Sequence, residues 1–379
     1  MRKTLRRAAA LSLALAASLW GCGGGSASEP TSATAGLPAP DAVAVPAPPE
    51  DLPPAPDGVF ATAELPAPSM ASPAPDARFG CGAMGQLPLG EELPLLDDRL
   101  WIRPIEGSYA QPRAWDVMGA PEPERGETRL YFESGEEKMV IMSYELFATA
   151  GTDVVARVRE EQARSFPNDD LQRTDVLGEG VEALRSVPRT LDTSSEAVRV
   201  LTLFVISRDR TLQVLSFYVN PPAAAGGHAG CLGLALRSAR TLRVGGRSLS
   251  LGGALELWAG RRRLHVTLPP NGVVLTQPGP DFVVHRVFEL RPLGAPRVSG
   301  FIYFGSAPAN MRVTTDTVDL DLFGRPARFY RIPNEDGSTR LESMEDVGEH
   351  LYTHVQLTVP AGLSADAWIA AYGAARLLP

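Results

Sequence analysis

Two hydrophobic patterns, strict alternation and helical spacing, organise the chain from about residue 79 onward. Alternation over short runs rich in β-branched residues predicts strands, and apolar residues three or four apart predict helices. The elements expected in the first half are a strand at 100–105, a hairpin of 127–132 with 137–146, a helix at 152–165 capped by Thr152 and Asp153, a hairpin of 196–207 with 211–220, and a helix at 229–242. This half is therefore expected to be α+β.

The second half repeats that order of elements. Strands are expected at 261–272, 282–290, 299–304, 318–323, 327–332 and 350–359, followed by a helix at 364–378 that begins at Ser364. On that helix Trp368, Ile369, Tyr372 and Ala375 share one face at helical spacing. The helix at 152–165 has no counterpart after residues 305–310. We interpret the repeated order as a diverged tandem duplication.

The order of elements resembles the Mog1/PsbP-like fold of some bacterial lipoproteins. The resemblance rests on a first strand that ends in Pro and Gly, at 102–107 and 266–272, and on a long strand, small-residue loop and helix at 212–242 and 351–378. It implies two tandem α/β/α sandwich domains, 79–245 and 246–379, each with a mainly antiparallel sheet and packed helices. It also implies partner binding, and it assigns no catalytic residue.

The N-terminus has the pattern of an export signal. Residues 1–7 are basic, and residues 8–20 form an apolar run that is too short to span a bilayer. The run ends in Leu19, Trp20, Gly21 and Cys22, which resembles the lipobox of bacterial lipoproteins. That resemblance implies cleavage of residues 1–21 and lipidation of Cys22, with sorting to the outer membrane because no Asp follows the cysteine. The alternative is an ordinary cleaved signal in which Cys22 has no role.

A segment rich in Pro, Ala, Ser and Thr separates this signal from the folded part. Residues 22–78 have too few large apolar side chains to form a core, so we expect a disordered tether with polyproline II character. As a flexible coil it would span about 40 Å, and proline would extend it further. The alternative is a docking motif for a protein that binds proline-rich sequences.

Charge and cysteine content agree with export. The chain carries a formal net charge of −8, and cleavage before Cys22 would remove four cations and no acid, which leaves −12. Such an acidic protein is not expected to bind nucleic acid. Apart from Cys22 the only cysteines are Cys81 and Cys231, which we expect to form a structural disulfide. The alternative for this pair is a reactive or metal-binding thiol.

The sequence contains no recognisable catalytic or cofactor motif. The Gly-x-Ser-x-Gly elbow and Ser-x-x-Lys patterns are absent, and no Gly-x-Gly-x-x-Gly opens a predicted helix after a predicted strand, so we expect neither enzymatic activity nor a cofactor. His350 and His354 have the spacing of helical metal ligands, but they belong to a predicted strand, where such residues lie ~13 Å apart. We therefore expect no metal site. The other residues considered are His228, His265, His285, Asp319, Asp321, Arg261–Arg263, Trp101, Trp115, Trp258 and Trp368.

For each of these residues, an ordinary structural role is the first interpretation. Asp319 and Asp321 fit a solvated strand face, with Ca²⁺ binding or acid–base chemistry as the alternative. Arg261–Arg263 is placed at the junction of the two halves, where an anionic partner is the alternative. The tryptophans fit the core or a domain interface.

Three functional hypotheses follow. The first is a non-enzymatic, lipid-anchored protein of the cell envelope whose two α+β domains bind an envelope protein partner of unknown identity. The second is a periplasmic or surface binder of a small hydrophobic or glycan ligand, held between the two halves. A groove lined by tryptophans would favour it. The third is a hydrolase with no recognisable motif, which a cleft holding His near Asp or Ser would favour.

Overall fold

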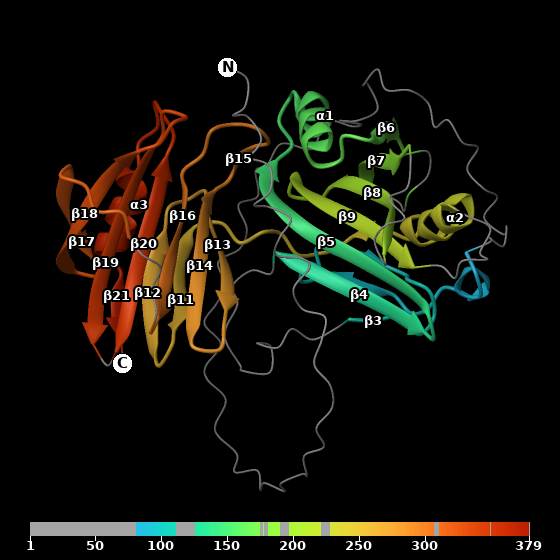
Figure 1. Cartoon of the computed structure of the whole chain (residues 1–379), viewed down its shortest axis with the longest axis horizontal. Coiled ribbons are helices and arrows are strands. Elements are labelled where there is room, and N and C mark those ends of the chain that lie inside the picture. Colours follow the sequence, from blue (N-terminus) through green and yellow to red (C-terminus); the bar gives the residue numbers. More distant parts are fainter. Residues whose placement is uncertain are drawn as a thin grey trace, which may run out of the picture. The chain divides into compact units, whose positions relative to one another are not determined.

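A computed structural model describes residues 81–110, 126–174, 177, 181–189, 197–220, 228–306, 311–348 and 350–378 (Figure 1). In these residues strands greatly outnumber helices, and nearly all strand pairs are antiparallel. The expected mainly antiparallel sheets are confirmed, and the fold is α+β or mainly β. Cys22 and the segment 22–78 lie outside the described residues, as does Trp115.

The first half contains a sheet with seven strands along its path, in the order β3-β4-β5-β9-β8-β7-β6. The strands are β3 (Tyr109–Ala110), β4 (Glu127–Ser134), β5 (Glu137–Thr149), β6 (Asp169–Arg173), β7 (Glu182–Pro188), β8 (Val198–Ile206) and β9 (Thr211–Asn220). Helix α1 (Val154–Ser165) joins β5 to β6, and helix α2 (His228–Ala239) follows β9. The two hairpins expected from alternation, β4–β5 and β8–β9, are both formed.

The second half contains a seven-stranded sheet in the order β13-β14-β16-β20-β19-β18-β17. The strands are β13 (Gly272–Pro278), β14 (Phe282–Glu289), β16 (Ser299–Gly305), β17 (Thr317–Leu322), β18 (Arg325–Pro333), β19 (Thr339–Gly348) and β20 (Leu351–Val359). Helix α3 (Asp366–Ala374) follows β20. After β14 the chain leaves this sheet and forms a short strand, β15 (Arg291–Pro292), which pairs with β5 of the first half.

Each half also has a small three-stranded sheet. The strands are β1 (Leu93–Leu95), β2 (Leu100–Ile102) and β10 (Arg243–Val244) in the first half, and β11 (Gly253–Ala259), β12 (Arg262–Leu268) and β21 (Arg376–Leu378) in the second. A 3₁₀ turn, η1 (Met84–Gln86), precedes β1. In both small sheets a hairpin from the start of the half pairs with a strand that follows the last helix.

The two halves therefore share one topology. Numbered within its half, each large sheet has the order 1-2-3-7-6-5-4, and each small sheet has its second hairpin strand in the middle. The difference lies in the third connection, which contains α1 in the first half and no described helix in the second. This agreement supports the interpretation of a duplication more directly than the sequence pattern does, because the return of strand 7 beside strand 3 is a non-local pairing.

Alternating side chains of the central strands enter two different cores in the first half. Leu203 of β8 joins the large core with residues of α2 and the small sheet, while its neighbour Phe204 joins a second core with Val154 and Val158 of α1. Adjacent residues of a strand point to opposite faces, so α1 and α2 cover opposite faces of this sheet. In the second half α3 and the small sheet share one core with the large sheet.

The ends of all three described helices differ from the sequence expectation, and α2 ends at Ala239 rather than at residue 242. The final helix ends at Ala374 rather than at residue 378, because Ala375 is extended and the last residues pair with β12 as β21. Asp153 occupies the N-cap position of α1, as expected, but its side chain makes no capping hydrogen bond, and its carboxylate instead accepts from Nε of Arg157. Ser364 does act near the start of α3, where its Oγ accepts from the amide of Asp366.

Candidate functional site

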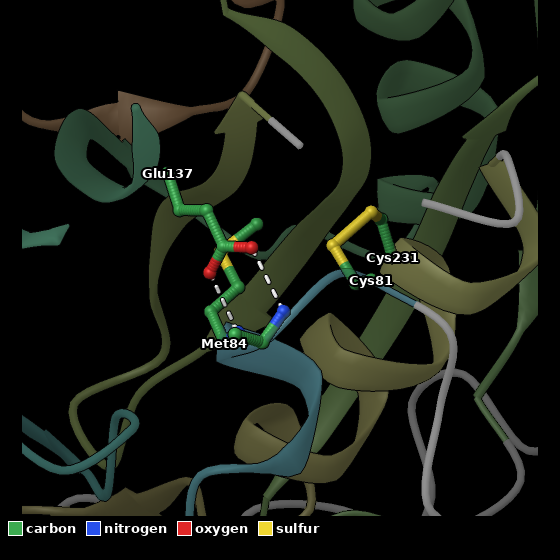
Figure 2. Close-up of a disulfide and its surroundings, with 5 residues drawn as sticks. Cys81, Met84, Glu137 and Cys231 are labelled. Atoms are coloured by element: carbon green, nitrogen blue, oxygen red, sulfur yellow. Dashed lines mark hydrogen bonds between the residues drawn. A yellow bond between two sulfur atoms is a disulfide. The ribbon is translucent and has the colours of Figure 1, made fainter. Parts of the chain in front are cut away.

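The first described residue is fastened to the first half by a disulfide. Cys81 and Cys231 of α2 are bonded; they lie 150 positions apart in the sequence, and their Cα atoms are 4.6 Å apart (Figure 2). Both cysteines are buried. The structure thus contains the disulfide that the sequence predicted.

A carboxylate completes this attachment. Glu137, at the start of β5, accepts from the amide of Ala83 through Oε1 at 2.8 Å and from the amide of Met84 through Oε2 at 2.7 Å (Figure 2). The side chain of Met84 is fully buried in the large core. The chain is therefore held directly after residue 80 by a covalent bond, two hydrogen bonds and an apolar anchor.

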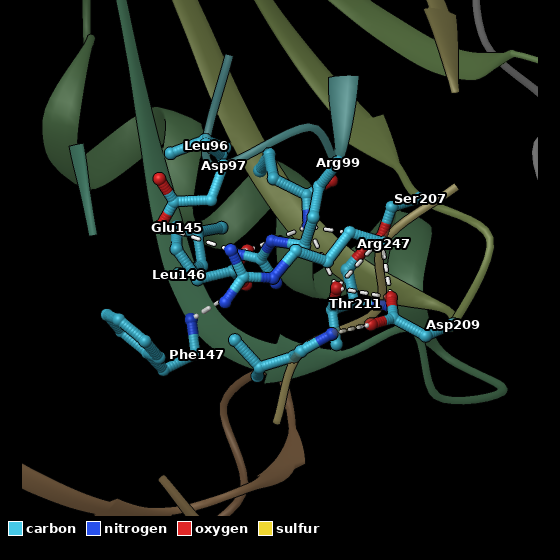
Figure 3. Close-up of polar contacts among 12 residues, drawn as sticks. Leu96, Asp97, Arg99, Glu145, Leu146, Phe147, Ser207, Asp209, Thr211 and Arg247 are labelled. Atoms are coloured by element: carbon cyan, nitrogen blue, oxygen red, sulfur yellow. Dashed lines mark hydrogen bonds and ion pairs between the residues drawn. The ribbon is translucent and has the colours of Figure 1, made fainter. Parts of the chain in front are cut away.

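A buried ion pair lies on the other end of β5. Nη2 of Arg99 is 2.5 Å from Oε2 of Glu145, and both side chains are sealed from solvent (Figure 3). Nε2 of Gln213 donates to the same oxygen at 2.8 Å, and the amide of Phe147 donates to Oε1 at 3.2 Å. Burial raises the pKa of Glu145 to about 7, against the opposing effect of Arg99 and the other donors.

Asp209, in the turn between β8 and β9, extends this polar cluster toward the second half. Its carboxylate accepts from the hydroxyl groups of Ser207 and Thr211, each at 2.6 Å, and from the amide of Leu249 at 2.7 Å. Burial acts to raise the pKa of Asp209, but these hydrogen bonds outweigh it and hold the pKa below its usual value. The turn thereby binds the chain at the point where the second half begins.

An irregularity in β5 follows Glu145 directly. The pairing of β5 with β9 shifts between Glu145 and Thr149, and Phe147 has a φ of +50°. Such a bulge redirects a side chain, and here the ring of Phe147 stacks on Phe288 of β14. Leu249, Val273 and Leu290 complete this small core. The bulge therefore supplies an apolar contact between the two sheets.

Beyond the bulge, β5 acquires a new neighbour. β15 pairs with it in parallel, matching Arg291 with Ala148 and Pro292 with Thr149. The amide of Leu293 then donates to the carbonyl of Thr149 at 3.0 Å. This pairing holds residues 292–297 beside α1.

A pocket of about 530 Å³ lies between α1, the end of β5 and residues 292–297. Its charged lining comprises Arg157, Glu160, Glu161, Arg164 and Arg297. Arg157 pairs with Asp153 at 2.8 Å and with Glu160 at 2.9 Å, and Arg164 pairs with Glu161. Arg297 forms no ion pair with a described residue. Its Nη1 donates to the carbonyls of Leu146 and Phe147, and its guanidinium lies 5.2 Å from the centre of the Phe288 ring.

The histidines that the sequence analysis considered are dispersed. His285 is buried, with Nδ1 3.0 Å from the Thr276 hydroxyl and Nε2 2.6 Å from the carbonyl of Trp258, and burial lowers its pKa to about 4. His354 lies 2.7 Å from Glu342, and His265 lies 2.7 Å from Glu256 at the surface. The described part of the chain contains no cluster of three potential metal ligands among its His, Cys, Asp and Glu residues.

The other candidates lie apart from the pocket. Asp319 faces Arg328 across the β17–β18 hairpin with its side chain 73% exposed. Arg261–Arg263 belongs to the β11–β12 hairpin and not to the junction of the halves, so that placement was wrong. Trp101 lies under Arg243, Trp258 borders the core of the second half, and Trp368 is buried in that core. None of these three tryptophans lines the pocket.

Glu145, Asp209 and Arg297 were not among the site residues predicted from the sequence. Glu145 alternates with apolar residues along β5, as solvent-facing residues do, and its partners lie 46 and 68 positions away. The chain contains many arginines, and Arg297 lies in a loop that has no recognisable motif. The one signal in the sequence was the acidic residue Glu145 beside the apolar residues at the end of β5.

Comparison with known proteins leaves the family of this chain undefined. No protein-family model matches it, and no curated protein matches it. Two solved structures are similar in part, the crystal structure of MucB in complex with MucA(peri) and the MucA/MucB complex of Pseudomonas aeruginosa. Each is 12% identical, with a TM-score of 0.17, over 75% of this chain and 92% of that chain. No described helix is long and apolar enough to cross a membrane.

Proposed function

We propose that this chain is a non-enzymatic lipoprotein of the cell envelope, anchored at Cys22, whose folded part binds a protein partner. The observation that carries the proposal is the attachment at residues 81–84, where the proline-rich segment meets the first half. A disulfide between Cys81 and Cys231 suits an oxidising compartment. Because Glu137 and Met84 reinforce it, tension on the preceding segment would act on the core of the first sheet.

The proposal keeps the finer description of the fold as two tandem α/β/α sandwiches of Mog1/PsbP-like type. The shared strand order of the two halves supports it, as do α1 and α2 on opposite faces of the first sheet. In the second half the described helix α3 lies on one face only. The two modules would be displayed at the outer membrane on the tether formed by residues 22–78.

A second candidate function is the binding of a ligand between the two halves. The pocket beside α1 favours it, because both halves contribute to its walls. The lining is charged and lacks the described tryptophans, so a hydrophobic or glycan ligand fits it poorly. A ligand or partner group with a negative charge fits better.

In vivo crosslinking of the tagged protein, followed by mass spectrometry, tests the proposed function. The matched control is Cys22→Ala, which removes the lipidation site and leaves the folded part unchanged. We expect the wild type to fractionate with membranes and to capture one envelope protein in near-stoichiometric amount. The variant should be released from the membrane fraction and should lose that partner.

Two results would contradict the proposal in different ways. If wild type and Cys22→Ala associate with membranes equally, the protein is not anchored by a lipid at Cys22. If the anchored protein captures no protein partner, the proposal of partner binding is wrong and the second candidate function is favoured.

A further inference from the structure

The pocket beside α1 contains one arginine without an acidic partner among the described residues. Its lining includes three arginines and two glutamates. Arg157 pairs with Asp153 and Glu160, and Arg164 pairs with Glu161, so these two arginines are neutralised. The remaining positive charge belongs to Arg297, which is half-buried.

Arg297 is held in place by contacts that leave its charge uncompensated. The carbonyls of Leu146 and Phe147 accept from Nη1, and the Phe288 ring lies beside the guanidinium. No described acceptor contacts Nε or Nη2, and neither atom is enclosed. A guanidinium carries five N–H donors and stays charged in proteins, so the donors at Nε and Nη2 can serve a group in the pocket.

Close approach of the backbone shapes the opposite wall. Gly294 has a φ of +79°, and a Cβ at this position would lie 2.8 Å from Cδ of Arg157. Glycine thus lets residues 292–297 lie against α1 while Arg297 is directed back toward β5. The wall is fixed by β15 pairing on one side and by this contact on the other.

We propose that this pocket binds one carboxylate, carried by an acidic side chain of a protein partner, through paired hydrogen bonds from Nε and Nη2 of Arg297. This inference rests on the proposed function. A planar carboxylate matches the guanidinium fork, and its single negative charge compensates that of Arg297. A phosphate dianion fits less well because Glu160 and Glu161 also line the pocket and would repel the second charge.

The competing role for Arg297 is purely structural, as a clamp on the carbonyls of the β5 bulge. A clamp predicts lower stability on substitution and no response to carboxylates. Binding measurements at the guanidinium itself separate the two roles.

The test uses the full mature chain carrying Cys22→Ala, labelled for NMR of arginine Nε–H groups. The probes are an end-capped pentapeptide of alanines with one central glutamate, the same peptide with glutamine, and sodium acetate. We expect a saturable shift of the Arg297 resonance with the glutamate peptide and none with the glutamine peptide. Affinity should fall by about 10-fold or more in Arg297→Gln, because a paired charge-assisted contact is lost. It should stay unchanged in Arg328→Gln, a control at an exposed arginine.

A second variant keeps the test valid if Arg297→Gln is unstable. Glu160→Gln leaves α1 and Arg297 in place and raises the net charge of the pocket, so it should tighten peptide binding several-fold at low salt. No shift with either carboxylate would overturn the proposal. Acetate binding as tightly as the peptide would overturn the assignment to a protein partner.

The proposed function fails separately from this inference. If Arg297→Gln still captures the crosslinked partner in full amount, the partner docks elsewhere. The lipoprotein proposal then stands, and the assignment of the pocket is wrong. If no partner is captured by any form, the proposed function fails whatever the peptide does.

Discussion

The rings of Phe147 and Phe288 stack almost in parallel, with centroids 4.9 Å apart and planes inclined by 6°. Phe147 belongs to the bulge of β5 and Phe288 to β14, so the contact joins the two large sheets. The bulge is in turn held by Glu145, whose Oε1 accepts from the amide of Phe147. A buried ion pair in one half thus positions the aromatic contact with the other.

Replacing Phe147 should weaken the junction of the halves. Phe147→Ala removes a ring that is 5% exposed, and we expect a loss of about 3 kcal/mol in the free energy of unfolding. Chemical denaturation monitored by circular dichroism measures the change. The matched control is Phe282→Ala, because Phe282 also stacks on an aromatic ring but is 37% exposed, and its loss should be below about 1 kcal/mol. Equal losses would contradict the assigned role of Phe147.

Removing the carboxylate of Glu145 should be costly because it leaves Arg99 buried without its partner. We expect Glu145→Ala to lower the free energy of unfolding by about 3–5 kcal/mol at pH 7. Glu145→Gln should cost less than Glu145→Ala, since the amide oxygen can still accept from Arg99, although the NH2 group would then face the amide of Phe147 in place of an acceptor. Replacing both members, as Arg99→Met with Glu145→Ala, should restore part of the stability. A cost below about 1 kcal/mol for Glu145→Ala would contradict this interpretation.

Two buried groups should give opposite pH dependences of stability. The pKa of Glu145 is raised from 4.5 to about 7, so its contribution is greatest below pH 4.5 and is lost as the pH rises to 7. The pKa of His285 is lowered from 6.5 to about 4, so its contribution is present above pH 6.5 and is lost as the pH falls toward 4. One pKa unit corresponds to about 1.4 kcal/mol, so each effect is roughly 3 kcal/mol and the two largely cancel.

Substitution of one group should reveal the other. In His285→Gln we expect the free energy of unfolding to fall by roughly 3 kcal/mol between pH 4.5 and pH 7. Adding Glu145→Gln should flatten that slope. Denaturant titrations at half-unit pH intervals provide the measurement. A slope that persists in the double variant would assign the titration to a different group.

Loss of the disulfide should destabilise the first half. Cys81→Ala with Cys231→Ala should lower the free energy of unfolding by about 2–5 kcal/mol, because the bond closes a long loop. Thermal unfolding of this variant is compared with that of Cys22→Ala, which removes a cysteine outside the described residues. We expect no change in Tm for the control. A Tm that is unchanged in the double variant would show that Glu137 and Met84 suffice to hold the start of the first half.

Local sequence predicted the elements whose signal is self-contained. The β4–β5 and β8–β9 hairpins have long alternating runs around short turns, and α1 has a clear helical period. The short strand β6 and the polar strand β19 were not predicted, because neither run alternates strongly and each is stabilised by its neighbours in the sheet. The last helix was predicted too long because the apolar pattern continues to Leu378, where pairing with β12 prevails over helix formation.

The sequence by itself determined the class of the fold, the repeated order of elements, the cysteine pair and the expectation of export. Each of these depends on residues that are close in the chain or on simple counts. Only the tertiary structure decided which residues meet at the junction of the halves. Glu145 and Arg99 lie 46 positions apart, and Arg297 reaches the bulge from 150 positions away. Burial and charge balance at such contacts depend on non-local packing, which no local pattern in the sequence encodes.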